Sequence, residues 1–305
     1  MVSKQFVAKK RRMRRGWSDI VFDSVVWIFL IVVSLLVLYP LIYVVSASFS
    51  SAQAVMAGRV WFLPVELSTA AYDAVFKNQS IMTGYINSFI YMVLGTSINI
   101  VTTLLCAFCL SRKEFFGRGI VNGMLVFTMF FSGGLIPTYL LIRDLGWLNT
   151  ITAMIIPNAM NAWYVILMRS FMTSAIPEDL YESANLDGCS PYGMLWRITV
   201  PMSGSIIAVV ALYVAVGIWN SYFDAFIYLT SKELYPLQVV LRNILILNQL
   251  DFNVVQDLRE LASRQGMSNL IKYAIIVVSS APLLLLYPFV QKFFVKGIMI
   301  GSLKG

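Results

Sequence analysis

IPEDLYESANLDGCSPYGMLWRITVPMSGS, residues 176–205, is a polar stretch that lies between two long apolar runs. Pro177 is favoured in the first turn of a helix, and the two acids that follow it complement the positive end of that helix. Gly188 can adopt a positive φ and end the helix, and the Ser-Pro pair after it is typical of a second helix start. Pro201 is expected to stop this second helix before the next apolar run. We therefore predict a helix–turn–helix over residues 176–203, which we call the bracket.

The composition places the rest of the chain in a lipid bilayer. Its 305 residues are 59% hydrophobic and only 12% charged, with a mean hydropathy of +0.76, whereas soluble domains are about 45–50% apolar and about 25% charged. The chain has no histidine, which excludes histidine-dependent metal sites, proton relays and catalytic triads. The formal charge of +8 does not indicate nucleic-acid binding, because seven of the 23 basic residues precede the first apolar run.

Six apolar segments are long enough to cross a hydrocarbon core, which takes about 20 residues of helix. They are residues 21–47, 84–110, 119–142, 150–172, 204–230 and 270–296. Lipid offers no partner for unpaired backbone groups, so all six are predicted to be transmembrane helices and the fold class is all-α. The predicted membrane domain is residues 21–296, between a basic N-terminus (1–20) and a tail (297–305). The sequence contains neither an obvious fixed-spacing repeat nor a GxxxxGK[ST] phosphate loop.

Basic residues beside the spans predict the orientation, because cytoplasmic flanks carry an excess of Lys and Arg. With the N-terminus inside, the inner segments hold 15 basic residues, and the outer segments hold eight basic residues accompanied by seven acids. Both termini and the bracket are then cytoplasmic. The basic N-terminal cluster is interpreted as a topology signal and a contact for anionic membrane lipid. The first apolar run is longer than the roughly 7–15 residues of a signal peptide core, so we expect a retained span.

Two outer segments, residues 48–83 and 231–269, are long and polar enough to form ordered caps. Within the second, residues 251–265 are typical of a short surface helix. The chain has three cysteines, two of them one turn apart inside an apolar segment. Three are too few for a disulfide framework, and we interpret all three as packing residues. No metal site is predicted.

Eight positions of the bracket follow a recognisable pattern of an acid, small residues, an Asp-Gly pair, an aliphatic residue and a proline. These positions are Glu182, Ser183, Ala184, Asp187, Gly188, Cys189, Ile198 and Pro201. In this order and spacing they resemble the EAA loop of ABC-importer permeases, by which the membrane subunit is gripped by its ATPase. Ser183 and Cys189 replace alanines, Leu195 stands at the usual aromatic position, and Ser205 stands where a second proline is common.

Three further features are similar to the carbohydrate branch of these permeases. They are Trp219-Asn220 in the fifth apolar segment, Ser46-Ala47-Ser48-Phe49 after the first, and the C-terminal VKGIMIGSLKG, which resembles the tail of the smaller maltose-type permease. The resemblance covers residues 20–305 and implies a type I ABC importer permease fold. It also implies import of a carbohydrate by alternating access. The sequence as a whole resembles the branch that imports oligosaccharides released from plant or algal polysaccharides.

The same resemblance implies the partners. A six-span chain forms half of a pathway, so a second permease subunit is expected as a heterodimer partner, together with two ATPase subunits and an extracytoplasmic solute-binding protein. ATP and Mg²⁺ would be bound by the ATPase subunits, so this chain is expected to need no cofactor and to be no enzyme. Alternatives are an ABC permease for another solute and, less favoured, a stand-alone secondary transporter, which would require coupling groups in several spans.

Two sets of site residues are predicted. The ATPase-coupling set, carried over from the resemblance, is Glu182, Ser183, Ala184, Asp187, Gly188 and Pro201. The candidate substrate-path set is Trp219, Asn220, Tyr222, Asp224, Asn158 and Asn161. Asp224 is the only clear acid inside a predicted span, and ionisable groups in a membrane are functional candidates. The alternatives are that Asp224 lies near the outer interface and pairs structurally with Lys232 or with another helix, and that the two asparagines of the fourth span make interhelical hydrogen bonds.

Overall fold

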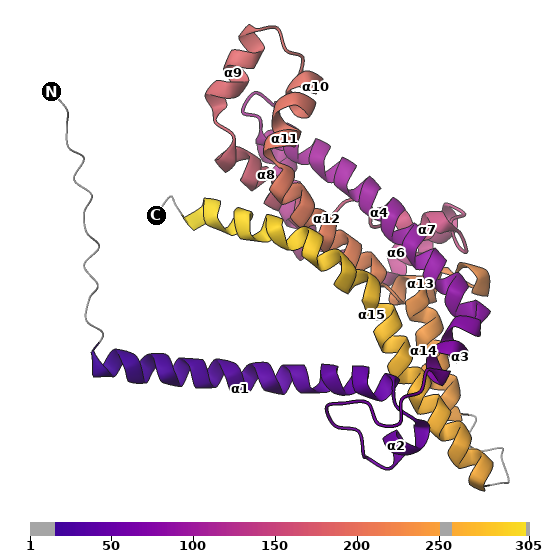
Figure 1. The fold of residues 1–305 in the computed structure, drawn as a ribbon. Coiled ribbons are helices and arrows are strands. Elements are labelled where there is room, and N and C mark those ends of the chain that lie inside the picture. The colour runs from indigo at the N-terminus through magenta and orange to yellow at the C-terminus, as the bar shows by residue number, and fades with distance from the viewer. Residues whose placement is uncertain (1–15, 251–257, 303–305) are drawn as a thin grey trace.

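The computed structural model describes residues 16–250 and 258–302, and these residues form helices and irregular connections with no strand among them. The helices are α1 (Trp17–Ser48), α2 (Ala52–Met56), α3 (Ala70–Lys77), α4 (Gln79–Ser111), α5 (Arg118–Phe130), α6 (Leu135–Asp144), α7 (Ile151–Ile155), α8 (Ala162–Ala175), α9 (Glu178–Leu186), α10 (Pro191–Met194), a π-helix (Leu195–Thr199), α11 (Val200–Met202), α12 (Gly204–Trp219), α13 (Phe223–Tyr228), a 3₁₀ turn (Lys232–Leu234), α14 (Leu237–Leu250) and α15 (Leu258–Ser302). Figure 1 shows their arrangement.

Within the described residues, three helices are long and apolar enough to cross a membrane. They are α1, α4 and the Gly266–Leu285 part of α15. Two bent pairs raise the number to as many as five if each pair is one span, namely α5 with α6 at 112° and Pro191–Met202 with α12 at 80°. The all-α membrane fold is therefore confirmed, whereas the count of six spans stays a prediction.

Three of the six predicted spans are not single continuous helices. Residues 119–142 are divided between α5 and α6, because Gly134 has φ +83 in the connection. Residues 150–172 are interrupted between Ile155 and Ala162. Residues 204–230 are divided between α12 and α13. Lipid does not tolerate open backbone, so such breaks must lie against protein or water.

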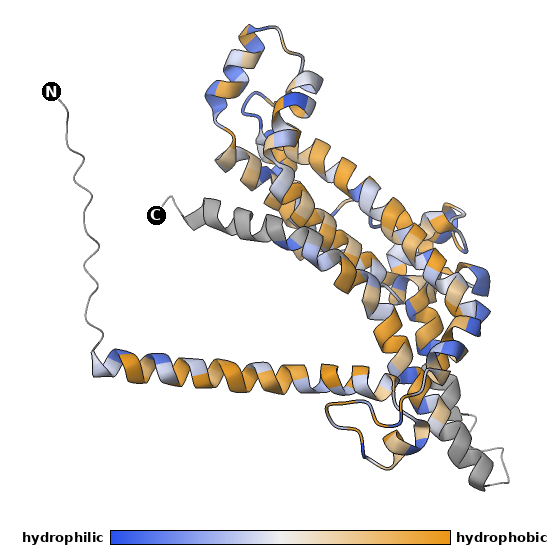
Figure 2. Cartoon of the chain, viewed as in Figure 1, coloured by the Kyte–Doolittle hydropathy of each residue, from blue (hydrophilic) through white to orange (hydrophobic). Residues whose placement is uncertain are grey.

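Helix α1 extends away from the body of the molecule and meets it only near its C-terminal end (Figure 1). Its only buried residues are Ser46, Ala47 and Ser48. The ring of Tyr43 meets the ring of Tyr273 of α15 edge-to-face, with 5.7 Å between centroids. Most of the remaining α1 side chains are apolar and exposed (Figure 2). This helix is therefore suited to lipid or to another membrane subunit.

Helix α4 lies at the centre of the packed body and contacts α8, α12 and α14. Its C-terminal half joins α8, α12 and the bracket in the largest hydrophobic cluster of the described residues. Its N-terminal half packs against α14 and α15. The amide of Asn87 donates to the backbone carbonyls of Glu233 and Tyr235, which joins α4 to the connection before α14.

The bracket lies at one end of the molecule, and α2, α3 and α14 lie at the opposite end (Figure 1). This separation agrees with the prediction that residues 48–83 and 231–269 form caps on the other side of the membrane. Ser51 and Arg59 both bind the carboxylate of Glu66 in the first cap. The basic N-terminal cluster, residues 251–257 and the last three residues of the tail lie outside the described residues. From Leu258 onward, the predicted surface helix is the beginning of α15.

Candidate functional site

The first half of the bracket is a helix with defined ends. Pro177 is the N-cap residue of α9, and the acids Glu178 and Asp179 occupy its first turn. At its end, Gly188 has φ +75, its N–H donates to the Asn185 carbonyl, and the next N–H donates to the Ala184 carbonyl. This pair of hydrogen bonds is a Schellman motif, which requires a left-handed residue at the glycine position. The predicted glycine turn is confirmed.

The second half of the bracket is more continuous than predicted. The Ser190 hydroxyl caps α10 by accepting the N–H of Gly193, as its sequence position indicates. The helix then widens into the π-helix and continues through Pro201 as α11, so the expectation that Pro201 ends it is wrong. Proline has no N–H to donate, and a widened turn tolerates that missing bond. The chain instead bends by 80° at Ser203.

The structure brings five of the six predicted coupling residues to the same turn and its flanking helix. Glu182, Ser183, Asp187 and Gly188 are exposed, and Ala184 is half-buried. Pro201 is also exposed but lies at the base of the bracket, beside the membrane body. Leu186 was not in the predicted coupling set, but its exposure of 89% places a large apolar side chain at the tip of α9. The tip therefore presents acids and one apolar residue, which can dock a protein surface.

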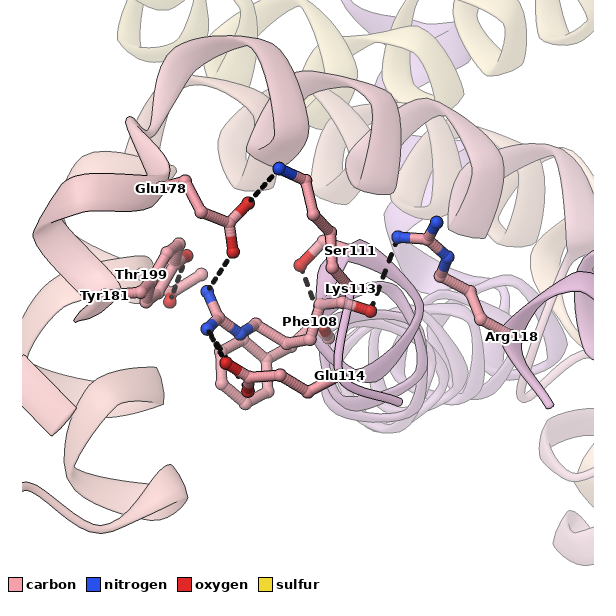
Figure 3. Close-up of polar contacts among 9 residues, drawn as sticks. Phe108, Ser111, Lys113, Glu114, Arg118, Glu178, Tyr181 and Thr199 are labelled. Atoms are coloured by element: carbon pink, nitrogen blue, oxygen red, sulfur yellow. Dashed lines mark hydrogen bonds and ion pairs between the residues drawn. The ribbon is translucent and has the colours of Figure 1, made fainter. Parts of the chain in front are cut away.

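The base of the bracket is held by a buried arginine that sequence reasoning missed as well. Arg112, at the C-cap of α4, is only 9% exposed. Its guanidinium lies 3.9 Å from the ring centroid of Tyr181 and 3.5 Å from a carboxylate oxygen of Glu178. The Tyr181 hydroxyl is hydrogen-bonded to that of Thr199 in the π-helix at 2.9 Å (Figure 3). We call Arg112, Glu178, Tyr181 and Thr199 the clasp.

The surroundings of the clasp set the electrostatics of Tyr181. Burial raises the pKa of its phenol, and the Thr199 hydrogen bond and the Arg112 charge oppose this shift less strongly. The phenol is therefore neutral at physiological pH and can donate or accept one hydrogen bond. Two other charges flank the clasp in Figure 3: Lys113 lies 3.4 Å from Glu178, and Glu114 lies 3.4 Å from Arg112. Both flanking side chains are mostly exposed.

A second candidate site is a polar cavity of about 180 Å³ in the membrane body. Its lining residues come from α4, α7, the α7–α8 break, α8, α12, the connection that follows α12, and α13. They include Asn99, Asn158, Asn161, Tyr164, Tyr213 and Asp224. The amide of Asn158 donates to the Asp224 carboxylate at 3.1 Å. The two polar patches predicted separately in the fourth and fifth spans are therefore one site, and Asp224 pairs with Asn158 rather than with Lys232.

The break between α7 and α8 is satisfied by α4. The amide of Asn99 donates to the Asn158 carbonyl at 2.9 Å, and the Thr102 hydroxyl donates to the Ala159 carbonyl. Asn161 then caps α8 by accepting the N–H of Trp163. Irregular backbone at membrane depth is tolerated where it is buried in protein or lines a water-filled cavity. Here two carbonyls of the break are paired by α4, and the break lines the cavity.

Three of the six predicted path residues do not line the cavity. Trp219 is buried in the α4–α14–α15 core, and its indole N–H donates to the Ser279 carbonyl at 3.0 Å. The Asn220 amide donates to its own helix. The ring of Tyr222 lies 5.8 Å from the guanidinium of Arg242. The sequence pattern identified the segment correctly, but side-chain direction decides which members face the cavity.

The cysteines of α4 are free, Cys106 partly buried and Cys109 exposed, and Cys189 packs against the bracket core. Across residues 16–250 and 258–302, no group of three or more Cys, Asp or Glu side chains is placed to hold a metal ion.

Residues 6–300 match the family of binding-protein-dependent transport system inner membrane components. The chain belongs to this family. The membership confirms the predicted membrane subunit of an ABC-type import system, which is not an enzyme, and agrees with the several candidate membrane helices. It also confirms that the family works with a solute-binding protein.

The family members most useful for comparison cover nearly the whole chain. It is 38% identical to the polygalacturonan/rhamnogalacturonan transport system permease protein YtcP of Bacillus subtilis (strain 168), over 93% of this chain and 98% of that protein. It is 38% identical to Protein LplC of the same organism, over 98% and 100%. The crystal structure of a bacterial ABC transporter involved in the import of the acidic polysaccharide alginate matches with a TM-score of 0.84 and 35% identity, over 92% and 99%.

Proposed function

We propose that this chain is one permease subunit of an ATP-driven importer that moves an oligosaccharide across the cytoplasmic membrane by alternating access. The observation that carries this proposal is the high identity, over almost the full length, to a permease of a polygalacturonan/rhamnogalacturonan transport system and to a subunit of an alginate importer. The proposed partners are a second, different permease, two ATPase subunits that bind ATP and Mg²⁺, and an extracytoplasmic solute-binding protein. Both termini are proposed to be cytoplasmic.

The bracket is proposed to dock in the ATPase subunit. The exposed acid Glu182 and the exposed tip residue Leu186 lie on a short helix that projects beyond the packed body (Figure 1). The Schellman turn at Gly188 gives this tip one shape, so little conformational entropy is lost on binding. Asp187 at the turn and Pro201 at the base belong to the same docking and coupling segment.

The polar cavity is proposed to be part of the solute path. Asn99, Asn158 and Asn161 offer amide donors and acceptors, and Asp224 offers a carboxylate acceptor, which together suit the hydroxyls of a sugar. The rings of Tyr164 and Tyr213 lie 6.5 Å apart and nearly parallel, at 11°, on the cavity wall. Aromatic faces of this kind pack against the apolar faces of sugar rings. A break in a membrane helix beside the cavity is typical of transport sites.

The proposal is tested first by purifying the tagged chain from its native membrane and identifying what accompanies it by mass spectrometry. Recovery of an ATPase, a second permease and a saccharide-binding protein is expected, and recovery of the chain alone after crosslinking would revive the stand-alone transporter. Glu182→Ala is then expected to reduce recovery of the ATPase, because a buried interfacial charge pair cut on one side costs about 2–5 kcal/mol. Asp144→Ala, an exposed acid outside the bracket, is the matched control.

The solute path is tested by uptake of uronate and neutral oligosaccharides into proteoliposomes that contain the complete importer. Asp224→Ala is expected to reduce uptake without reducing recovery of the ATPase. Asn220→Ala is the control, because Asn220 is four residues away and its amide bonds only its own helix. Equal uptake by the Asp224 and Asn220 variants would remove the cavity from the path.

A further inference from the structure

We infer that the clasp is the mechanical link through which the bracket moves α4, and that Arg112 is its positioning residue. This inference rests on the proposed docking of the bracket with an ATPase, and it adds a residue that belongs to no part of the docking tip. The observation behind it is a buried arginine at the end of the central helix: two of its side-chain partners, Glu178 and Tyr181, lie in the bracket, and a third, Glu114, lies in the connection after α4.

Arg112 is held in two directions. One guanidinium nitrogen lies 3.5 Å from the Glu178 carboxylate in the first turn of α9, and the cation lies over the Tyr181 ring one turn later. A buried guanidinium is costly when its charge is left unpaired. Separation of α4 from α9 would take Arg112 away from the Glu178 carboxylate, so this cost opposes separation of the two helices. The carboxylate resists sliding along the guanidinium edge, and the ring restricts the guanidinium plane. The contact therefore transmits force in both directions.

The clasp also gathers the neighbouring helices at the same point. The Tyr181–Thr199 hydrogen bond joins the first helix of the bracket to the π-helix of the second. From α8, the Nε of Arg169 donates to the Leu110 carbonyl at 3.1 Å, two residues before the C-cap of α4. The two halves of the bracket and the ends of α4 and α8 therefore meet within a few residues.

A cavity of about 360 Å³ lies beside the clasp, between the ends of α4 and α8 and the start of α9. Arg112, Glu178 and Tyr181 line it together with Met172 and Ile176. Tyr181 and Ile176 also belong to the largest hydrophobic cluster, so α9 is joined to the body by apolar packing as well as by the clasp. The cavity leaves space beside this contact, and a shift at the base of the bracket moves these two core residues with it.

Helix α4 carries that shift to the polar cavity. It is one continuous helix from Gln79 to Ser111, and Asn99 lies 13 residues before Arg112, about 20 Å along the axis at 1.5 Å per residue. Asn99 and Thr102 donate to two carbonyls of the α7–α8 break. Displacement of α4 at the clasp thus changes the hydrogen bonds that shape the cavity wall.

The test uses the complete importer in proteoliposomes and measures three quantities: the ATPase recovered with the permease, ATP hydrolysis stimulated by the loaded binding protein, and sugar imported per ATP hydrolysed. Arg112→Gln is expected to leave ATPase recovery unchanged and to lower the import-to-hydrolysis ratio about tenfold, within the range of coupling energies carried by single residues. Glu178→Gln is expected to lower the ratio similarly. The double variant is expected to add little, because both changes break the same Arg112–Glu178 ion pair.

Lys113→Gln is the matched control. Lys113 contacts the same Glu178 carboxylate, but its side chain is 69% exposed, so the ratio is expected to stay within about twofold of the unaltered protein. An unchanged ratio in Arg112→Gln, or additive losses in the double variant, would overturn the inference. If Arg112→Gln does not assemble, Glu178→Gln decides by the same ratio. Absence of the ATPase from the unaltered complex would instead overturn the proposed docking, so the two failures are distinguishable.

Discussion

The turn at Gly188 allows a prediction whose size can be worked from its geometry. Gly188 has φ +75, and a Cβ built at this position meets no heavy atom within 4 Å. Substitution therefore carries no steric penalty from neighbours, only the cost of the left-handed backbone. That cost is about 1–2 kcal/mol for a residue with a Cβ, and it is offset by about 0.4–1 kcal/mol because alanine also restricts the unfolded chain. A net cost of about 1 kcal/mol remains for Gly188→Ala.

If the altered turn leaves the left-handed conformation in the free permease and must regain it on docking, about 1 kcal/mol corresponds to roughly a fivefold weaker affinity. Gly188→Asn is expected to bind nearly as the unaltered chain does, because asparagine tolerates the left-handed region. Gly188→Val is expected to be weaker than Gly188→Ala, since β-branched residues are the least tolerant.

The assay is titration of the purified ATPase subunit onto the permease in lipid nanodiscs, with the three variants compared with the unaltered chain. The expected order of affinity is the order of left-handed tolerance, from Gly through Asn and Ala to Val. Equal weakening by Asn and Val would refute the reasoning, because it would mean that lost space rather than backbone conformation decides. Unchanged affinity in all three would show that the turn does not determine the docked shape.

Three further predictions concern other positions. Gly193→Ala places a Cβ 2.7 Å from the Sγ of Cys189 and is expected to lower the yield of folded protein, and Cys189→Ala in the same chain is expected to restore it; chromatography in detergent measures both. Asn149→Ala removes the acceptor of two backbone N–H groups after α13 and is expected to destabilise that junction by about 1–3 kcal/mol, measured as a lower thermal midpoint than for Asn149→Asp. The hydrogen bond from Ser51, and after it the guanidinium of Arg59, lower the pKa of Glu66 below 4.5. A carboxyl whose pKa is lowered by folding stabilises the fold at pH values above its unfolded pKa, and this stabilisation is lost as the pH falls through its folded pKa. Hydrogen exchange in residues 48–83 is therefore expected to increase only below pH 4.5.

The parts of the bracket that were predicted correctly depend on local chemistry. A proline before two acids, a glycine after the helix and a Ser-Pro pair act within one or two turns, and Gly188 and Ser190 lie where those rules place them. The end at Pro201 was predicted wrongly because the proline rule assumes α-helical spacing. The π-helix before Pro201 changes that spacing, and it is accompanied by the Thr199 contact with Tyr181, 18 residues away.

The parts that were missed depend on distant residues. In the sequence Arg112 is one more basic residue at the end of a span, and its role becomes visible only with Glu178 and Tyr181 across the fold. The break after α7 was missed for the same reason, because the amide that donates to its Asn158 carbonyl belongs to Asn99, 59 residues away. The signal available in advance was weak: an arginine directly after a span and an acid at the start of the next inner loop.

The length of α4 has a consequence for the bilayer around it. Its 33 residues extend about 50 Å at 1.5 Å per residue, whereas the hydrocarbon core is about 30 Å thick. A helix longer than the lipid is thick adapts by tilting, yet here Asn87 ties one end to the outer connection and Arg112 ties the other to the bracket. We therefore expect acyl-chain length to act on the angle between the bracket and the opposite end of the molecule, so that the activity of this subunit changes with the thickness of the membrane that holds it.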